Sequence, residues 1–145
     1  MRTLSLAIAM AAAAGTGTPP PMANHAAVSN GWFRALPRNL PAGGYFDLEN
    51  TGRWMIRLTG AASPACGMLL LHKSEETGGV GRMEDVGEVD IPAHGTIRFT
   101  PGGYHLMCMD PTAAMKPASS VPVTLKFSDT TTATATFVVR NARGQ

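Results

Sequence analysis

The stretch Val121–Phe127, with the sequence Val-Pro-Val-Thr-Leu-Lys-Phe, places an apolar side chain at every odd-numbered position. Successive side chains of an extended chain point to opposite faces, so this alternation is typical of a strand that turns one face to a core. Residues 132–137 repeat the pattern, with alanines and a phenylalanine on one side and threonines on the other. The end of the chain therefore predicts two half-buried β-strands.

Shorter stretches of the same alternation recur along the chain, separated by turn residues such as Gly78-Gly79. Short strands interrupted by Gly, Pro and Asn every ~8 to 12 residues are typical of a sandwich or barrel. The predicted fold class is all-β, a single-domain antiparallel β-sandwich of the immunoglobulin-like kind. The expected strands cover residues 27–35, 44–50, 54–60, 66–72, 95–100, 104–109, 121–128 and 132–140.

The composition agrees with this fold class and excludes some functions. Of the 145 residues, 44% are hydrophobic and only 15% are charged, with 16 Gly and 11 Pro. This balance suits short strands and tight turns better than long surface helices. The formal net charge of +2 gives no basic patch for phosphate groups, so we expect no nucleic acid partner.

The N-terminal segment resembles an export signal. A positively charged start precedes an unbroken apolar run over residues 4–14, which is too short to span a bilayer as a helix. Cleavage is expected near Ala14 or Ala23. We expect residues 1–23 to form the signal peptide and a flexible leader, and residues 24–145 to form one exported, soluble domain with no membrane span.

Histidine and methionine residues gather in the middle of the sequence. In the tripeptide His105-Leu-Met107, an extended chain directs the imidazole and the thioether to the same face. His72 lies in the same region, and Met83 stands in a polar, Gly-flanked context where burial in a core is not expected. Imidazole binds several transition metals, whereas the soft thioether selects Cu(I). The pattern favours a copper(I) site.

The spacing of these residues resembles that of a known family. His72, Met83, His105 and Met107 reproduce the His-x10-Met-x21-His-x-Met pattern of the periplasmic copper chaperones often called PCuAC. Segments that look like the family's characteristic ones cover most of the chain between residues 27 and 140: Trp32–Pro37, Tyr45–Gly52, Pro101–Met107 and Val121–Phe127.

The resemblance implies a cupredoxin-like sandwich that holds one Cu(I) through His72, Met83, His105 and Met107. It implies a monomeric periplasmic metallochaperone, with no enzymatic turnover and no catalytic residues. The expected role is to carry Cu(I), together with Sco-type thiol proteins, towards the copper-centre subunit of cytochrome c oxidase during its assembly. Thioether ligands suit this compartment, because they resist the disulfide chemistry that would disable a pair of thiolates.

The sequence leaves open whether other methionines and histidines act as metal ligands. Met109 shares strand parity with His105 and Met107, and Met68 precedes His72 by four residues on the same strand face. His25, near the expected start of the mature chain, is a flexible residue that could bind a second ion weakly.

Two alternative functions compete with the chaperone. A blue-copper electron-transfer protein shares the sandwich but needs a cysteine thiolate ligand, and strand alternation turns Cys108 away from Met107. A metal-free exported interaction module would hold no copper. A hydrolase is disfavoured because neither Gly-x-Ser-x-Gly nor His-Glu-x-x-His occurs. The cluster of acidic residues is interpreted as charged side chains of a solvated loop; its members are Glu84, Asp85, Glu88 and Asp90.

The two cysteines, Cys66 and Cys108, favour a structural disulfide, since exported proteins with an even and minimal count tend to pair them. Two buried free thiols remain the alternative. If His72 and His105 faced each other on antiparallel strands, a regular ladder would offset the sulfurs by three residues, or about 10 Å. That separation is too large for a disulfide.

Overall fold

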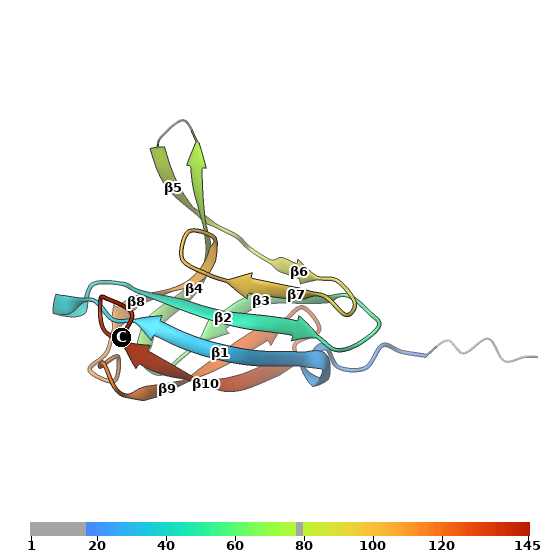
Figure 1. Cartoon of the computed structure of the whole chain (residues 1–145). Helices are drawn as coiled ribbons and strands as arrows, with labels where there is room; N and C mark the ends of the chain where they lie inside the picture. The colour runs from blue at the N-terminus through green and yellow to red at the C-terminus, as the bar shows by residue number, and fades with distance from the viewer. Residues whose placement is uncertain (1–16, 78–79) are drawn as a thin grey trace, which may run out of the picture.

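The computed structural model describes residues 17–77 and 80–145 (Figure 1). The predicted signal peptide and leader cover residues 1–23, of which residues 1–16 lie outside these ranges, as does the turn expected at residues 78–79. Two short 3-10 helices are present, η1 (Met22–His25) and η2 (Pro37–Asn39). The strands are β1 (Ala26–Arg34), β2 (Ala42–Asn50), β3 (Ile56–Ala62), β4 (Cys66–Thr77), β5 (Val80–Asp85), β6 (Val89–Ile91), β7 (Thr96–Phe99), β8 (Tyr104–Pro111), β9 (Ser120–Phe127) and β10 (Thr132–Arg140).

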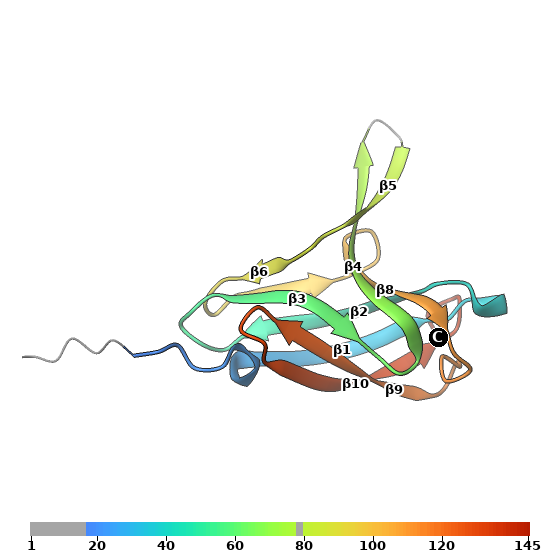
Figure 2. The ribbon, with the colours of Figure 1, turned by 180° about the vertical axis from the view of Figure 1, so that it is seen from behind.

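These strands form one mixed sheet in the order β5-β4-β8-β2-β1-β10-β9-β3-β6, with β7 also paired to β2. The two opposite views show that the sheet curls, so that β3 and β4 lie behind β1 and β2 (Figures 1 and 2). The prediction of an all-β single domain is confirmed. The expected antiparallel pairing needs one correction, because the first strand and the last strand, β1 and β10, pair in parallel.

The core is built from the faces that the alternation predicted. The odd-numbered residues of β9 are buried, whereas most of its even-numbered residues are exposed. Phe33, Phe46 and Phe137 come from the neighbouring strands β1, β2 and β10 and are fully buried. The ring centroid of Phe137 lies 5.4 Å from that of Phe33 and 5.5 Å from that of Phe46, within the range of favourable aromatic contacts. This cluster fixes the inner face of the sheet.

The strand pattern missed the hairpin formed by β4 and β5. β4 continues to Thr77, beyond the predicted end at residue 72, and β5 pairs with it in antiparallel register. The hairpin stands away from the body of the sheet (Figures 1 and 2). Its outer part has no core to face, so its sequence shows no hydrophobic alternation.

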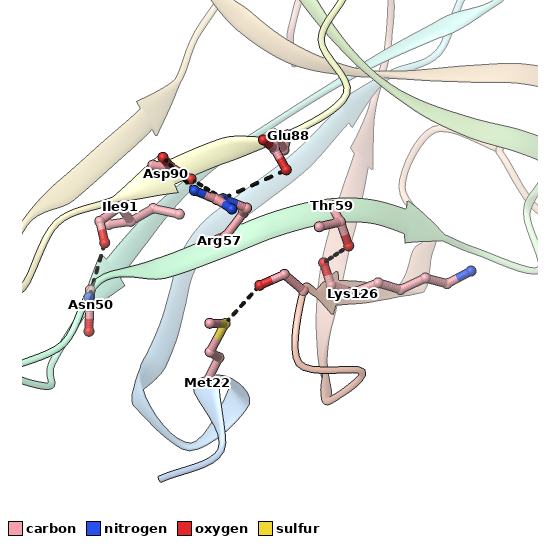
Figure 3. A network of polar contacts seen from close by, with 9 residues as sticks. Met22, Asn50, Arg57, Thr59, Glu88, Asp90, Ile91 and Lys126 are labelled. Atoms are coloured by element: carbon pink, nitrogen blue, oxygen red, sulfur yellow. Dashed lines mark hydrogen bonds and ion pairs between the residues drawn. The ribbon is translucent and has the colours of Figure 1, made fainter. Parts of the chain in front are cut away.

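The interpretation of the acidic residues as loop charge is wrong for most of them. Glu84 and Asp85 lie in β5, and Asp90 lies in β6. Asp90 accepts a hydrogen bond from Arg57 of β3, with Nε 2.6 Å from Oδ1, and Glu88 lies 3.6 Å from the same Nε (Figure 3). These carboxylates therefore help to attach the edge strand β6 to the sheet.

Asn50, at the end of β2, organises the turns beside β6. Its side chain is fully buried, and Nδ2 donates to the carbonyl oxygens of Trp54 at 2.7 Å and Ile91 at 3.1 Å. Figure 3 shows the contact with Ile91. Oδ1 accepts the backbone N–H of Gly52 at 3.0 Å. One amide thus joins the β2–β3 turn to the β6–β7 turn.

Cys66 and Cys108 form a disulfide, as favoured from the sequence, with their Cα atoms 5.3 Å apart. The three-residue offset is present, because Cys108 lies opposite Leu69. The expected separation of about 10 Å is nevertheless wrong. Asp110 has a left-handed φ of 49°, and a Cβ on Gly67 would lie 2.9 Å from the Cβ of Asp110. The strands bend at this close approach, which brings Cys66 back towards Cys108.

We expect thiol titration of the denatured, unreduced protein to find no free thiol. Reduction should lower the free energy of unfolding by about 4 kcal/mol, because the bridge closes a loop of 42 residues. The double variant Cys66→Ser/Cys108→Ser is the control, and its stability should not respond to reductant. Two free thiols per chain would contradict the bridge.

Candidate metal centre

His72 and His105 face each other across the pair formed by β4 and β8. They are direct register partners, and their ring centroids lie 5.6 Å apart with the ring planes at 82°. The residues beside them, Leu71 and Leu106, are also register partners and are buried in the core. Because successive side chains alternate between faces, both imidazoles lie on the outer face of the sheet.

The backbone orients the ring of His105. This residue is only 3% exposed, and its Nδ1 lies 3.1 Å from the carbonyl oxygen of Gly103. A carbonyl can only accept a hydrogen bond, so Nδ1 carries the proton and Nε2 keeps a free lone pair. Nε2 is buried, with no hydrogen-bond partner in residues 17–77 and 80–145. This arrangement is the one that commonly prepares a histidine for a metal ion.

Burial lowers the pKa of His105 below its ordinary value of 6.5, because the charged imidazolium is poorly solvated there. The hydrogen bond to Gly103 raises the pKa by a smaller amount, and the neighbouring His72 lowers it further. The ring is therefore neutral near neutral pH, which is the form that binds metals.

His72 lies between His105 and the hairpin strand β5. In β5 its register partner is Asp85, and a carboxylate oxygen of Asp85 is in contact with Nε2 of His72. Both ring nitrogens of His72 are buried, and Nδ1 has no hydrogen-bond partner in the part of the chain that the structure describes. The contact with Asp85 occupies Nε2. Nδ1 of His72 and Nε2 of His105 are thus two neighbouring imidazole nitrogens without hydrogen-bond partners on one face of the sheet.

The predicted methionine ligands line a cavity beside this histidine pair. The cavity has a volume of about 440 Å³, and Met83, His105 and Met107 are among its lining residues. Met107 follows His105 by two positions on the same face of β8, whereas Met83 lies on β5 and is 63% exposed. The structure therefore brings three of the predicted residues to one cavity and places the fourth, His72, against His105.

The sequence reasoning missed the residues that form the wall of this cavity. Gly43 of β2 is the register partner of Met107, and a Cβ at Gly43 would lie 2.6 Å from the hydroxyl oxygen of Tyr45. Glycine therefore allows Tyr45 to lean over β2 beside Met107. Arg34 and Ser74 also line the cavity. Arg34 and Tyr45 lay in segments that the resemblance had marked, whereas Gly43 and Ser74 did not.

The residues left open as ligands occupy other positions. Met68 and Met109 are register partners on β4 and β8, but they are not among the residues that line the cavity. His25 ends the helix η1, where its carbonyl oxygen accepts the N–H of Thr51 at 2.9 Å. The description of His25 as a flexible residue is therefore wrong.

The disulfide bears on the blue-copper alternative. Cys108 is fully buried and faces the core, opposite to Met107, as the strand alternation predicted. The sequence contains two cysteines, and they are bonded to each other. Neither can supply the thiolate that a blue-copper site requires.

Comparison with known proteins places this all-β chain in the class of PCuAC-like folds. The PCuAC domain of PmoF2, solved with copper bound, superimposes with a TM-score of 0.65 at 23% identity, covering 81% of this chain and 93% of that domain. The copper(I) form of DR1885 from Deinococcus radiodurans, solved in solution, has a TM-score of 0.63 at 29% identity, covering 77% of this chain and 75% of that protein.

The sequence comparisons define the family. Residues 26–139 match the family model described as "Putative lipoprotein LpqE-like". The chain is a member of this LpqE-like family. A relative from Leifsonia xyli subsp. xyli, named "Putative lipoprotein Lxx21020", is 32% identical over 127 residues, covering 87% of this chain and 76% of the relative. Within residues 17–77 and 80–145, no helix is long and apolar enough to cross a membrane.

The lowered pKa of His105 predicts how the stability of the metal-free protein depends on pH. In the unfolded chain the pKa of a histidine is ~6.5. At pH values between this pKa and the lower pKa of the folded protein, the unfolded chain binds more protons than the folded protein does. The stabilising contribution is complete above about pH 6.5 and is lost as the pH falls below it. Urea unfolding with a chelator present, between about pH 7.5 and 5.5, measures this effect.

The variant His105→Gln should show a weaker loss of stability over the same pH range. His94→Asn is the matched control, because His94 is exposed with a φ of 58°, a conformation that asparagine tolerates. An equal loss of stability in the wild type and in His105→Gln would contradict the assignment to His105.

Proposed function

We propose that this protein is an exported copper(I) metallochaperone that holds one Cu(I) through His72, Met83, His105 and Met107. The observation that carries the proposal is the direct pairing of His72 with His105, whose buried Nε2 lacks a hydrogen-bond partner among the described residues, beside a cavity lined by two thioethers. A buried nitrogen without a partner is costly, and a metal ion at that position would remove the cost. The copper in the solved PmoF2 and DR1885 structures supports the choice of ion.

The donor set suits Cu(I) more than other ions. Two neutral imidazoles and two thioethers are soft or borderline ligands and add no negative charge, whereas Mg²⁺ and Ca²⁺ prefer carboxylate and carbonyl oxygens. The wall residue Arg34 adds a positive charge to the cavity, which further disfavours divalent cations. The proposed role is binding and delivery of copper, with no catalytic turnover.

The positions of the ligands suggest how the ion is released. His105 is buried and held by Gly103, whereas Met83 lies on the projecting hairpin and is largely exposed. A partner protein could displace Met83 first and enter the coordination sphere while the histidines still hold the ion. We propose Sco-type thiol proteins and the copper-centre subunit of cytochrome c oxidase as the partners, and a monomer as the working form.

The N-terminal contacts bear on export. The N–H of Met22 donates to Oδ2 of Asp129 at 2.8 Å, and the N–H of Ala23 donates to Oγ1 of Thr131 at 3.1 Å. Cleavage after Ala23 would remove both contacts, so we propose cleavage near Ala14. Both cysteines of the sequence are in the disulfide, so neither carries a lipid, and we propose the periplasm as the location.

Replacing Met107 by Leu should weaken Cu(I) binding at least about tenfold, equivalent to ~1.4 kcal/mol, because leucine keeps the apolar volume but removes the sulfur ligand. Met83→Leu should act in the same direction. Anaerobic competition with a Cu(I) chelator, at less than one equivalent of copper, measures the affinity.

Met68→Leu is the matched control for both variants. Met68 is exposed on the same outer face of β4 and β8 but lies outside the cavity, so its replacement should leave the affinity unchanged. Equal affinities for the wild type, Met107→Leu and Met83→Leu would exclude the proposed ligand set. Absence of stoichiometric binding in the wild type would favour the metal-free interaction module.

A further inference from the structure

A second cavity lies at the other end of β1 from the metal centre. It has a volume of about 470 Å³, and its lining includes Met22, His25, Trp54, Met55 and Asp129. β1 begins directly after His25 and ends at Arg34, which lines the first cavity. At ~3.3 Å per residue, the length of β1 separates the two cavities by more than about 20 Å. Donors at one cavity cannot serve an ion at the other.

The helix η1 brings two soft-metal donors to this cavity. Met22 and His25 are its first and last residues. Side chains three positions apart in a 3-10 helix lie one above the other, so the thioether and the imidazole share one face of η1. Asp129 and Thr51 hold the two ends of the helix through the N–H of Met22 and the carbonyl oxygen of His25.

The ring of His25 is held in place, and one of its nitrogens lacks a hydrogen-bond partner among the described residues. It rests on Gly52, where a Cβ would lie 2.8 Å from Cγ of the ring. Its Nε2 is buried and finds no hydrogen-bond partner in the described ranges 17–77 and 80–145. A buried polar atom without a partner destabilises the folded state, and an ion bound at that atom would remove the cost.

Met55 provides the third donor. It directly precedes the buried Ile56 of β3, and its own side chain is 42% exposed. Met55 therefore does not have the core-filling role that usually explains a methionine. It lines the same cavity as Met22 and His25.

We propose that Met22, His25 and Met55 form a second soft-metal site that binds one Cu(I). One imidazole and two thioethers make a neutral donor set of the kind that selects this ion. The carboxylate of Asp129, at the same cavity, adds a negative charge that favours a cation. With three donors in place of four, the second site binds more weakly than the first. This inference goes beyond the proposed function, and it predicts two ions per chain.

The test is a titration of the exported protein with silver(I), a stable substitute for Cu(I), followed by NMR of ¹³C-labelled methionine methyl groups. The methyl signals of Met83 and Met107 should shift first, and those of Met22 and Met55 should shift as a second equivalent binds. His25→Gln and Met55→Leu should weaken the second event at least about tenfold and leave the first unchanged. Met68→Leu, which replaces an exposed methionine outside both cavities, should change neither event.

The outcomes separate the two proposals. Methyl signals of Met22 and Met55 that stay fixed up to two equivalents would overturn the second site, as would an unchanged second event in both His25→Gln and Met55→Leu. A natural N-terminus after Ala23, found by mass spectrometry, would also overturn it by removing Met22. If Met22 and Met55 respond while Met83 and Met107 do not, the second site stands and the proposed chaperone site fails.

Discussion

The register between β4 and β8 is the constraint on which the candidate metal centre depends. The pairing places His72 opposite His105 on the outer face and Leu71 opposite Leu106 in the core. A slip of one residue on β8 would turn His105 into the core and expose Leu106, so burial of the leucines stabilises the alignment of the histidines. The disulfide ties the same two strands together beyond the last of these pairs.

The candidate centre combines a rigid part with an accessible part. His105 and Met107 lie on β8, between two strands of the sheet, and the side chain of His105 is fixed by a backbone carbonyl. Met83 lies on the edge strand β5, which pairs with β4 alone among the strands of residues 17–77 and 80–145. A carrier needs both properties, since a preorganised set of donors increases affinity and an exposed donor allows exchange with a partner.

The sequence predicted the elements whose side chains alternate against a core, such as Val121–Phe127, because burial of one face leaves a period of two in the chain. It missed β5, because residues 81–85 of this strand are all exposed and leave no buried face. It also missed β6, where Val89 and Ile91 are buried on either side of Asp90, because three residues are too few to show an alternation. The spacing of histidine and methionine led to the four proposed ligands through a resemblance. The orphaned nitrogen of His105 and the bend at Asp110 depend on tertiary packing, so no local pattern encodes them.

The parallel pairing of β1 with β10 has a consequence for the order in which the molecule assembles. The first strand of the domain finds its place beside the last one, and Phe33 packs against Phe137 only when both are present. A chain that emerges from its N-terminus onwards cannot complete this core until its final strand is available, because non-local pairing must wait for the distant segment. The packing of β1 against β10 is therefore among the last contacts that a chain can form as it emerges from its N-terminus.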